Sequence, residues 1–297
     1  MSTSTKHLTT QAAKLHQLLQ KPELLVMPCC FDGMSARLVE NAGFPLTFMS
    51  GFAVSAARLG APDTGLISYG EMLDQGRNIC AAVSIPVIGD GDTGYGNALN
   101  VKRTVFGYGQ AGFAAVMIED QVAPKRCGHT RGKSVVGRAD AIARVKAATH
   151  ARDEGAGILI LARTDARATH GLDEALWRAQ AFADAGADIV FVESPVAQAE
   201  LERIGRAITV PLLANMLEDG DTPILPPATL QTLGFKIAAY PVTLINAAIV
   251  AMQHALASLH KGETPAGLMS FAQLRQVVGF DSYDAEAARY AVAPEVV

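Results

Sequence analysis

The residues best suited to chemistry lie in a basic loop that reads PKRCGHTRGKSVV from position 124. This loop places the thiol of Cys127 among Lys125, Arg126, His129 and Arg131. Positive charge favours the ionised form of a thiol, so we expect Cys127 to have a lowered pKa and to act in proton transfer or nucleophilic attack.

Gly128 would give this loop the mobility to open and close over a site. His129 fits either a functional role or packing within the loop. The other cysteines, Cys29, Cys30 and Cys80, are interpreted as small buried hydrophobic residues.

Carboxylates gather in a second segment, GDGDTGYGN, which starts at position 89. If the preceding strand continues through it, Asp90 and Asp92 point the same way, and Glu119 ends the next predicted strand. Several carboxylates in one place repel each other unless a cation holds them, and oxygen ligands suit Mg²⁺ or Mn²⁺ better than zinc. The alternative is a simple Asp-Gly turn.

Short apolar runs must position these side chains, and they recur along the whole chain. They cover residues 24–28, 46–50, 86–90, 114–120, 158–165, 188–194, 211–216 and 236–241. Continuous apolar runs of strand length are typical of parallel strands buried on both faces. Amphipathic helical patterns separate them, for example in residues 138–157 and 172–188. Eight strands alternating with helices predict a (β/α)8 barrel, an α/β fold.

Polar residues stand where these predicted strands end. In such a barrel the carboxyl ends of the strands form the active face. The set comprises Ser50, Asp90, Asp92, Glu119, Asp120, Arg163, Asp165, Glu193 and Asn215. Any one of them could merely cap the following helix, but the set as a whole predicts an enzyme.

Composition narrows the class of protein. The chain has 297 residues, of which 49% are hydrophobic and 18% charged, as in a soluble globular protein. A net charge of -4 gives no reason to expect nucleic acid or an anionic membrane as partner. We see no signal-peptide core and no apolar stretch of the ~20 residues that a membrane span needs, so we expect a cytoplasmic protein with reduced thiols.

One barrel domain is predicted over residues 1–297, because no linker or shift in composition divides the chain. A surplus helical segment, 242–297, follows the last strand. Its helix is rich in Ala and Leu, which suggests subunit association.

Four segments, GDGDTGYG, IEDQVAPKRCGH, LARTDAR and ANMLEDG, resemble the isocitrate lyase and phosphoenolpyruvate mutase superfamily over nearly the whole chain. The cysteine in KRCGH looks like its carbon–carbon lyase branch, since the phosphonate mutases and hydrolases generally lack this thiol. The resemblance implies a bound Mg²⁺, with Mn²⁺ as an alternative, and cleavage of the bond beta to the carboxylate of a 2-hydroxy or 2-oxo acid.

Residue roles also follow from the resemblance. It implies Asp90 as the direct metal ligand, with Asp63, Asp92 and Glu119 acting largely through water. The implied catalytic residues are Cys127 as general acid with Lys125, His129, Glu119 and Arg163. The implied substrate-binding residues are Ser50, Gly51, Gly128, Arg163, Glu193, Asn215 and Pro241.

A malate-like substrate would lose its hydroxyl proton and break its C2–C3 bond in a retro-aldol step. The basic loop would stabilise the resulting carbanion, and Cys127 would protonate it. Some members of the superfamily have a tyrosine near Ser50, whereas this chain has Phe48 and Phe52, so the base for the hydroxyl proton is not assigned.

The substrate is predicted from the segment NMLEDG, where relatives that cleave methylisocitrate carry further donors. Met216 and Leu217 make this wall apolar, and a buried unpaired carboxylate would be costly. The chain looks most like the 2,3-dimethylmalate lyase and petal death protein group, which cleaves 2-alkylmalates or oxaloacetate. Pro241 and Thr243 are expected to shape the same pocket, or to start a helix.

Other functions stay open. They are oxaloacetate acetylhydrolase, methylisocitrate lyase, a phosphonate enzyme, and a noncatalytic barrel that binds a metabolite. The resemblance further implies a C-terminal helix exchanged between neighbours in a homotetramer.

Overall fold

Eight parallel strands form a closed barrel in which each strand pairs with the next and the last pairs with the first. The computed structural model describes residues 8–130 and 132–291. The strands are β1 (Leu25–Cys30), β2 (Thr47–Met49), β3 (Val87–Asp90), β4 (Ala115–Glu119), β5 (Leu159–Thr164), β6 (Ile189–Val192), β7 (Leu212–Asn215) and β8 (Ile237–Tyr240). The predicted α/β barrel is confirmed, and each strand lies in one of the predicted apolar runs except at the carboxyl end of β1, which continues to Cys30.

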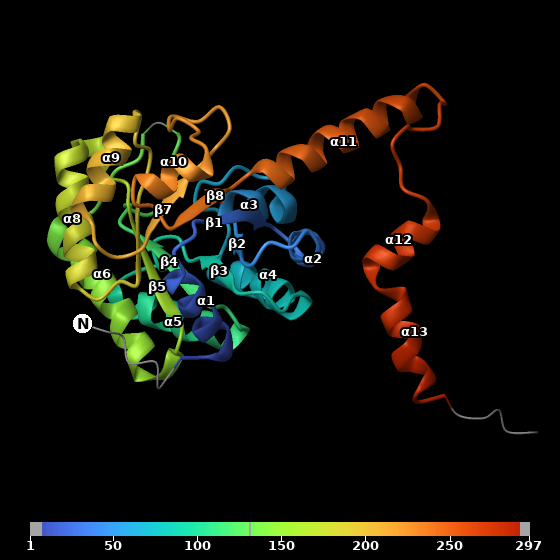
Figure 1. Cartoon of the computed structure of the whole chain (residues 1–297), viewed down its shortest axis with the longest axis horizontal. Helices are drawn as coiled ribbons and strands as arrows, with labels where there is room; N and C mark the ends of the chain where they lie inside the picture. Colours follow the sequence, from blue (N-terminus) through green and yellow to red (C-terminus); the bar gives the residue numbers. More distant parts are fainter. Residues whose placement is uncertain (1–7, 131, 292–297) are drawn as a thin grey trace, which may run out of the picture. The chain divides into compact units, whose positions relative to one another are not determined.

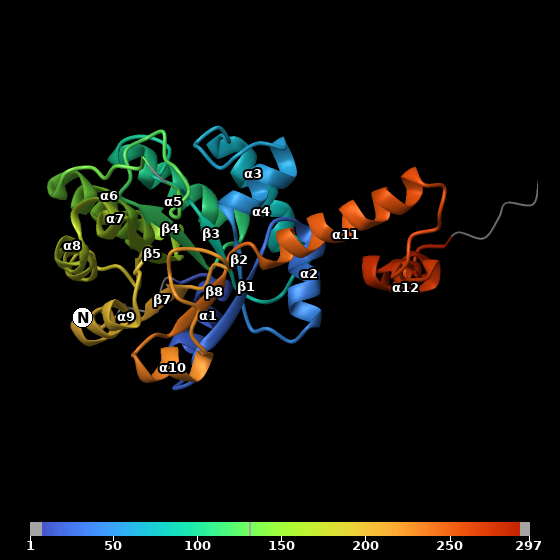
Figure 2. The same cartoon turned by 90° about the horizontal axis from the view of Figure 1, so that it is seen from above.

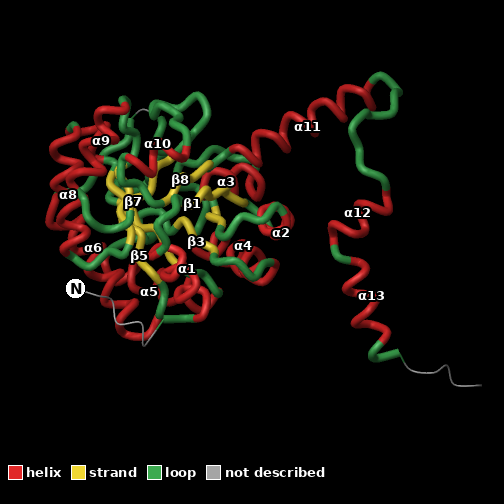
Figure 3. The backbone as a smooth tube through the Cα atoms, viewed as in Figure 1, coloured by secondary structure: helices red, strands yellow, loops and turns green. Residues whose placement is uncertain are grey.

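Helices surround the strands (Figures 1 and 2). They are α1 (Thr10–Gln20), α2 (Gly33–Asn41), α3 (Gly51–Leu59), α4 (Tyr69–Ala82), α5 (Ala98–Ala111), α6 (Arg138–Ala151), α7 (Ala166–His170), α8 (Leu172–Asp184), α9 (Gln198–Ala207) and α10 (Pro227–Thr232). The tube in Figure 3 shows the strands at the centre and these helices outside them. This is the alternation that the apolar runs and the amphipathic patterns predict.

The amino-terminal end of the barrel is closed by α1. Ala12, Leu15 and Leu19 of this helix belong to one buried cluster with barrel residues such as Met27 and Ile237. Burial there leaves the carboxyl-terminal end as the open face, where the loops that follow the strands lie.

The chain divides into two compact units, residues 1–246 and 247–297. The first contains the whole barrel. The second contains most of α11 (Thr243–His260), together with α12 (Phe271–Val278) and α13 (Phe280–Ala288). The division lies close to position 242, where the sequence places the start of the surplus segment.

No helix within the described ranges is long and apolar enough to cross a membrane. All four cysteines are free thiols, as the sequence predicts.

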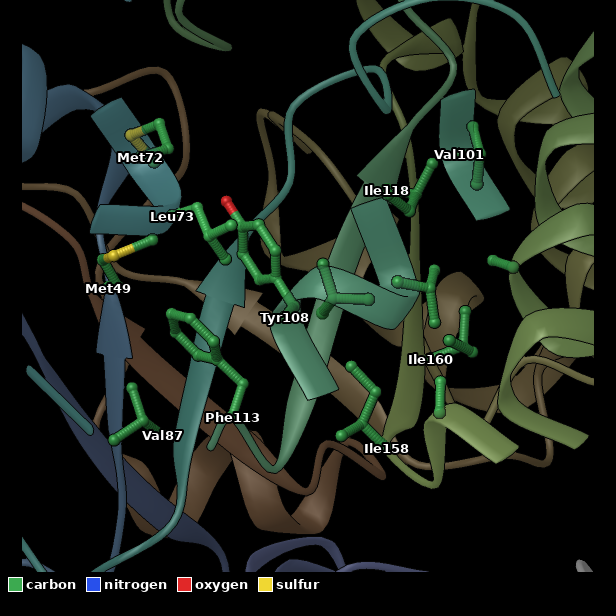
Figure 4. Packing of buried hydrophobic residues seen from close by; sticks show 14 of the residues in the cluster. Met49, Met72, Leu73, Val87, Val101, Tyr108, Phe113, Ile118, Ile158 and Ile160 are labelled. Atoms are coloured by element: carbon green, nitrogen blue, oxygen red, sulfur yellow. The ribbon is translucent and has the colours of Figure 1, made fainter. Parts of the chain in front are cut away.

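A packed aromatic pair supports β3 from outside the barrel (Figure 4). The rings of Tyr108 and Phe113 stack with centroids 4.7 Å apart, and both residues are fully buried. Gly89 makes room for them, because a Cβ there would stand 2.7 Å from each ring. Tyr108 Oη then donates to the Asp90 carbonyl at 2.6 Å, so the core fixes the end of β3.

Phe113→Ala should destabilise the barrel by about 3–5 kcal/mol, since it removes a buried ring that its neighbours cannot replace. The measurement is urea unfolding followed by circular dichroism. Leu99→Ala is the matched control, because Leu99 is 74% exposed and should change stability by less than about 0.5 kcal/mol. Equal losses in the two variants would contradict this view of the core.

Candidate active site

A cavity of about 260 Å³ opens among the carboxyl ends of the strands. Every strand or the loop after it contributes to the lining, and so does the basic loop. The lining includes Cys29, Phe48, Ser50, Asp63, Asp90, Met117, Lys125, Cys127, Gly128, His129, Arg163, Phe191, Glu193, Leu213, Asn215, Ala239 and Pro241. Gly51, Asp92 and Glu119 are not part of this lining but contact residues that are.

The carboxylates gather around Lys125. Its Nζ lies 2.6 Å from Asp63 Oδ1 and 2.8 Å from Asp92 Oδ1, and all three side chains are about 5% exposed. Strand β3 ends at Asp90, and Asp92 has a positive φ of 48°, so the two residues do not lie on one continuous strand. The Asp92 amide instead donates to Asp90 Oδ1 at 3.0 Å.

Excess negative charge shapes the ionisation of this cluster. Burial and the nearby Asp92 raise the pKa of Asp90 to about 6. Burial also raises the pKa of Glu119 well above its usual value, although Arg163 opposes it. Burial alone would lower the pKa of Lys125, but Asp92, Asp90 and Asp63 raise it well above its usual value. The positive charge of Lys125 therefore neutralises only part of the negative charge of these carboxylates.

The donor set fits a hydrated divalent cation. Glu119 Oε1 is buried and accepts no hydrogen bond, so it is available as an acceptor. Within the described part of the chain, no group of three or more His, Cys, Asp or Glu residues is arranged to hold a metal ion directly. An ion with few direct ligands and several waters, as Mg²⁺ usually has, meets both observations.

Ser50 and Gly51 start α3 beside Asp90. Ser50 caps the helix by accepting from the Ala53 amide at 3.3 Å, and the Gly51 amide donates to Asp90 Oδ2 at 3.2 Å. A Cβ at Gly51 would stand 2.5 Å from that oxygen, so only glycine permits this approach. The Gly51 amide is thus engaged with Asp90, while Ser50 lines the cavity.

Arg163, near the carboxyl end of β5, lines the cavity. It donates from Nε to Asp165 at 2.9 Å, lies 3.2 Å from Glu193 and 3.5 Å from Glu119. Burial would lower its pKa, but Asp165 and Glu193 raise it well above the usual value. The guanidinium thus stays charged at the cavity wall.

His129 docks the basic loop on the ends of β6 and β7. Its Nδ1 accepts from the Asp221 amide at 3.1 Å, which leaves the proton on Nε2, 3.1 Å from Glu193 Oε1. Asn215 Nδ2 is 3.4 Å from Glu193 Oε2. Burial would raise the pKa of Glu193, yet Arg163 and His129 lower it below its usual value.

The expected lowered pKa of Cys127 is wrong. Burial raises the pKa of this thiol, Asp63 and Glu193 raise it further, and Arg163 and the His129 amide offset them only in part. The sequence shows the cations of the loop but not the carboxylates that face them. A thiol that keeps its proton at neutral pH is suited to act as an acid rather than as a nucleophile.

Of the other residues expected around the pocket, some line the cavity and others do not. Arg126 lines the cavity from an exposed position, whereas Arg131 lies outside the described residues. Leu217 and Pro241 line the cavity, but Met216 is fully buried away from it. Thr243 does not line the cavity and donates to Glu218.

Sequence reasoning missed three residues that support the site. Lys133 and Ser194 both donate to the Gly128 carbonyl, and Tyr108 donates to Asp90. Lys133 stands in the basic loop, so its position there was a signal. Nothing in the sequence pairs the other two with their partners.

The model of the family described as phosphoenolpyruvate phosphomutase matches residues 15–260. The 2,3-dimethylmalate lyase of Eubacterium barkeri is 42% identical over 274 residues, which cover 91% of this chain and 94% of that protein.

Two solved structures are also similar. Oxaloacetate acetylhydrolase in complex with 3,3-difluorooxalacetate has a TM-score of 0.91 and 31% identity, covering 96% of this chain and 99% of that one. Phosphonopyruvate hydrolase in complex with oxalate and Mg²⁺ has a TM-score of 0.85 and 30% identity, covering 95% and 99%. With the barrel and its charged carboxyl-terminal face, these matches show that the chain belongs to the phosphoenolpyruvate mutase and isocitrate lyase superfamily, as a lyase-type enzyme.

Proposed function

We propose that the protein is an Mg²⁺-dependent lyase that cleaves 2,3-dimethylmalate or another 2-alkylmalate to a 2-oxo acid and a carboxylate. The single observation that carries this proposal is the position of Cys127 in a cavity that combines cations with an apolar wall, where burial raises the pKa of its thiol. The 42% identity to a 2,3-dimethylmalate lyase supports the same substrate class.

Asp90 would hold the metal directly, with Asp63, Asp92 and Glu119 acting largely through water; Mn²⁺ could replace Mg²⁺. When bound, the ion supplies positive charge that stabilises charge on the substrate oxygens. The unused acceptor at Glu119 and the raised pKa of Asp90 support a cation here.

The side chains of the cavity would bind and orient the substrate. Ser50 Oγ accepts from Ala53, which leaves its hydroxyl proton for a substrate carboxylate. Arg163 would pair with the same carboxylate, and Asn215 and His129 would orient the second one. Glu193 keeps Arg163 and His129 in place through its ion pairs.

In the reaction a base that is not assigned to a residue takes the 2-hydroxyl proton, the O–H electrons form the C2=O bond of the 2-oxo acid, and the C2–C3 bond breaks. The bonding electrons pass to the departing fragment, which becomes a carboxylate-stabilised carbanion. Lys125 and Arg163 would stabilise this charge, and Cys127 Sγ would deliver its proton to the carbon.

Apolar side chains limit what else the cavity accepts. Phe48, Phe52, Leu213, Leu217 and Val242 form an apolar part of its wall, where a third carboxylate would find no donor, although Arg126 and Thr130 line another part. A buried unpaired carboxylate costs several kcal/mol, which disfavours methylisocitrate. Oxaloacetate is the second candidate, because an oxaloacetate acetylhydrolase shares the fold with a TM-score of 0.91.

Cys127→Ser should lower turnover by ~10² or more, since serine is a far weaker acid at this position. The measurement is a coupled assay of 2-oxo acid release (pyruvate from 2,3-dimethylmalate and 2-methylisocitrate, the corresponding 2-oxo acid from other 2-alkylmalates), with acetate release from oxaloacetate alongside. Cys80→Ser is the matched control, because Cys80 lies outside the cavity lining. Turnover of none of these substrates, or turnover indifferent to Cys127, would sink the lyase mechanism and make phosphonopyruvate the next substrate to test.

Removal of divalent cations with a chelator should abolish turnover, and Mg²⁺ should restore it.

Because the pKa of Asp90 is raised to about 6, this carboxyl is protonated below that pH and then competes poorly for metal. The apparent Kd for Mg²⁺ should therefore rise by about tenfold per pH unit below the pKa and stay level above it. Calorimetric titration across this range checks it, and an affinity independent of pH would contradict it.

We also propose that the C-terminal unit joins subunits into a homotetramer by helix exchange. None of the residues of α12 and α13 is buried within this chain, even though these helices carry large aromatic residues. Phe271 is 73% exposed and Tyr283 is 71% exposed. Large exposed apolar side chains favour a protein partner. Light scattering should give four times the 31.2 kDa chain mass, and a monomer would contradict the proposal.

A further inference from the structure

The carbonyl of Gly128, next to Cys127, is held by two donors outside the cavity. Lys133 Nζ donates to it, and Ser194 Oγ donates to it at 3.0 Å. Neither residue lines the cavity, so the proposed reaction uses neither directly.

Lys133 is itself anchored to the barrel. Its Nζ lies 3.0 Å from Asp165 Oδ1, and the two side chains are 4% and 0% exposed. Asp165 also accepts from Arg163 Nε and Nη2 at 2.9 and 3.0 Å. The buried carboxylate of Asp165 thus contacts both Lys133 of the loop and Arg163 at the cavity wall.

A second buried carboxylate makes this anchor rigid. Asp120 accepts from the Asp165 amide at 2.9 Å and from Arg178 Nη1 at 3.0 Å. Arg178 Nη1 also donates to the Val136 carbonyl at 2.9 Å, at the far end of the loop. Removing Lys133 would leave Asp120 and Asp165 with one cation fewer. It would also remove the hydrogen bond that Lys133 donates to the Gly128 carbonyl.

The backbone of Gly128 lies directly against the side chains of Arg163 and Glu193 in the cavity wall. A Cβ there would stand 2.5 Å from both Arg163 Nη2 and Glu193 Oε2. Ser194 adopts a positive φ of 56°, which is uncommon for a residue with a side chain, and its hydroxyl reaches Gly128. A shift of this peptide would therefore displace both Cys127 and His129.

We propose that Lys133, anchored by Asp165, is a positioning residue that with Ser194 clamps the Gly128 carbonyl and seats Cys127 over the cavity. Naming Cys127 as the residue to be seated rests on the proposed function. The clamp itself rests on the contacts of Gly128 alone.

Alkylation of Cys127 tests the clamp without any turnover. In Lys133→Met, iodoacetamide should modify Cys127 on the order of tenfold faster or more, because the loop opens more often. Loss of a nearby cation would by itself disfavour the thiolate and slow the reaction, so a faster rate reports opening. Mass spectrometry of the peptide separates Cys127 from the other cysteines.

Three variants sharpen this experiment. Lys133→Arg should restore most of the protection, since it can keep the ion pair with Asp165. Ser194→Ala should increase the rate less than Lys133→Met, because it leaves the Lys133–Asp165 pair in place. Lys102→Met is the matched control: Lys102 forms an ion pair with Glu154 on the surface, and its loss should leave the rate unchanged.

Turnover gives the second measurement. Since Lys133 does not line the cavity, Lys133→Met should lower kcat by ~10-fold or more with little change in KM, and Lys133→Arg should recover it. An alkylation rate unchanged in both Lys133→Met and Ser194→Ala would overturn the clamp. If Lys133→Met does not fold, the rate in Ser194→Ala decides alone. A wild-type enzyme without lyase activity would refute the proposed function and leave the alkylation result to judge the clamp.

Discussion

The structure depends on balancing buried charge at the carboxyl ends of the strands. Four carboxylates, Asp63, Asp90, Asp92 and Glu119, lie nearly inaccessible to solvent. Arg163 is shared among Asp165, Glu193 and Glu119, so Glu119 links this guanidinium to the four carboxylates. Isolated buried charges are costly, so each group persists only through its partners. The proposed binding of a metal and of an anionic substrate, and the raised pKa of Cys127, all depend on this balance.

The fold supplies the rigidity that such a balance requires. The stacked rings of Tyr108 and Phe113 hold the end of β3 from outside, and the start of α3 holds Asp90 from inside. The basic loop, like the segment that carries Asp63, lies outside the strands of the barrel. Its position depends on side-chain contacts at Gly128 and His129.

Much of the fold follows from the sequence, because buried parallel strands require continuous apolar runs and amphipathic helices must separate them. The carboxyl ends of those runs also locate Ser50, Glu119 and Glu193, since barrel topology brings strand ends together. The pKa of Cys127 could not be predicted in the same way. It depends on burial and on Asp63, which is far from Cys127 in sequence.

The clamp was equally hidden. Lys133 and Asp165 are 32 residues apart, and Gly128 and Ser194 are 66 apart. No local pattern links such pairs, and the left-handed conformation of Ser194 is not encoded by a glycine. Asp92 departs from the predicted strand for the same reason, because its contacts with Asp90 and Lys125 determine its conformation.

Carbanion protonation by an exchangeable thiol is the central claim, and the fate of the proton tests it most directly. The reaction of 2,3-dimethylmalate in D₂O with Mg²⁺ should yield pyruvate and propanoate with one deuterium at C2, as read by NMR. In Cys127→Ser we expect that neither deuterated propanoate nor pyruvate is released. Propanoate without deuterium, or a product that retains the C2–C3 bond, would contradict the account.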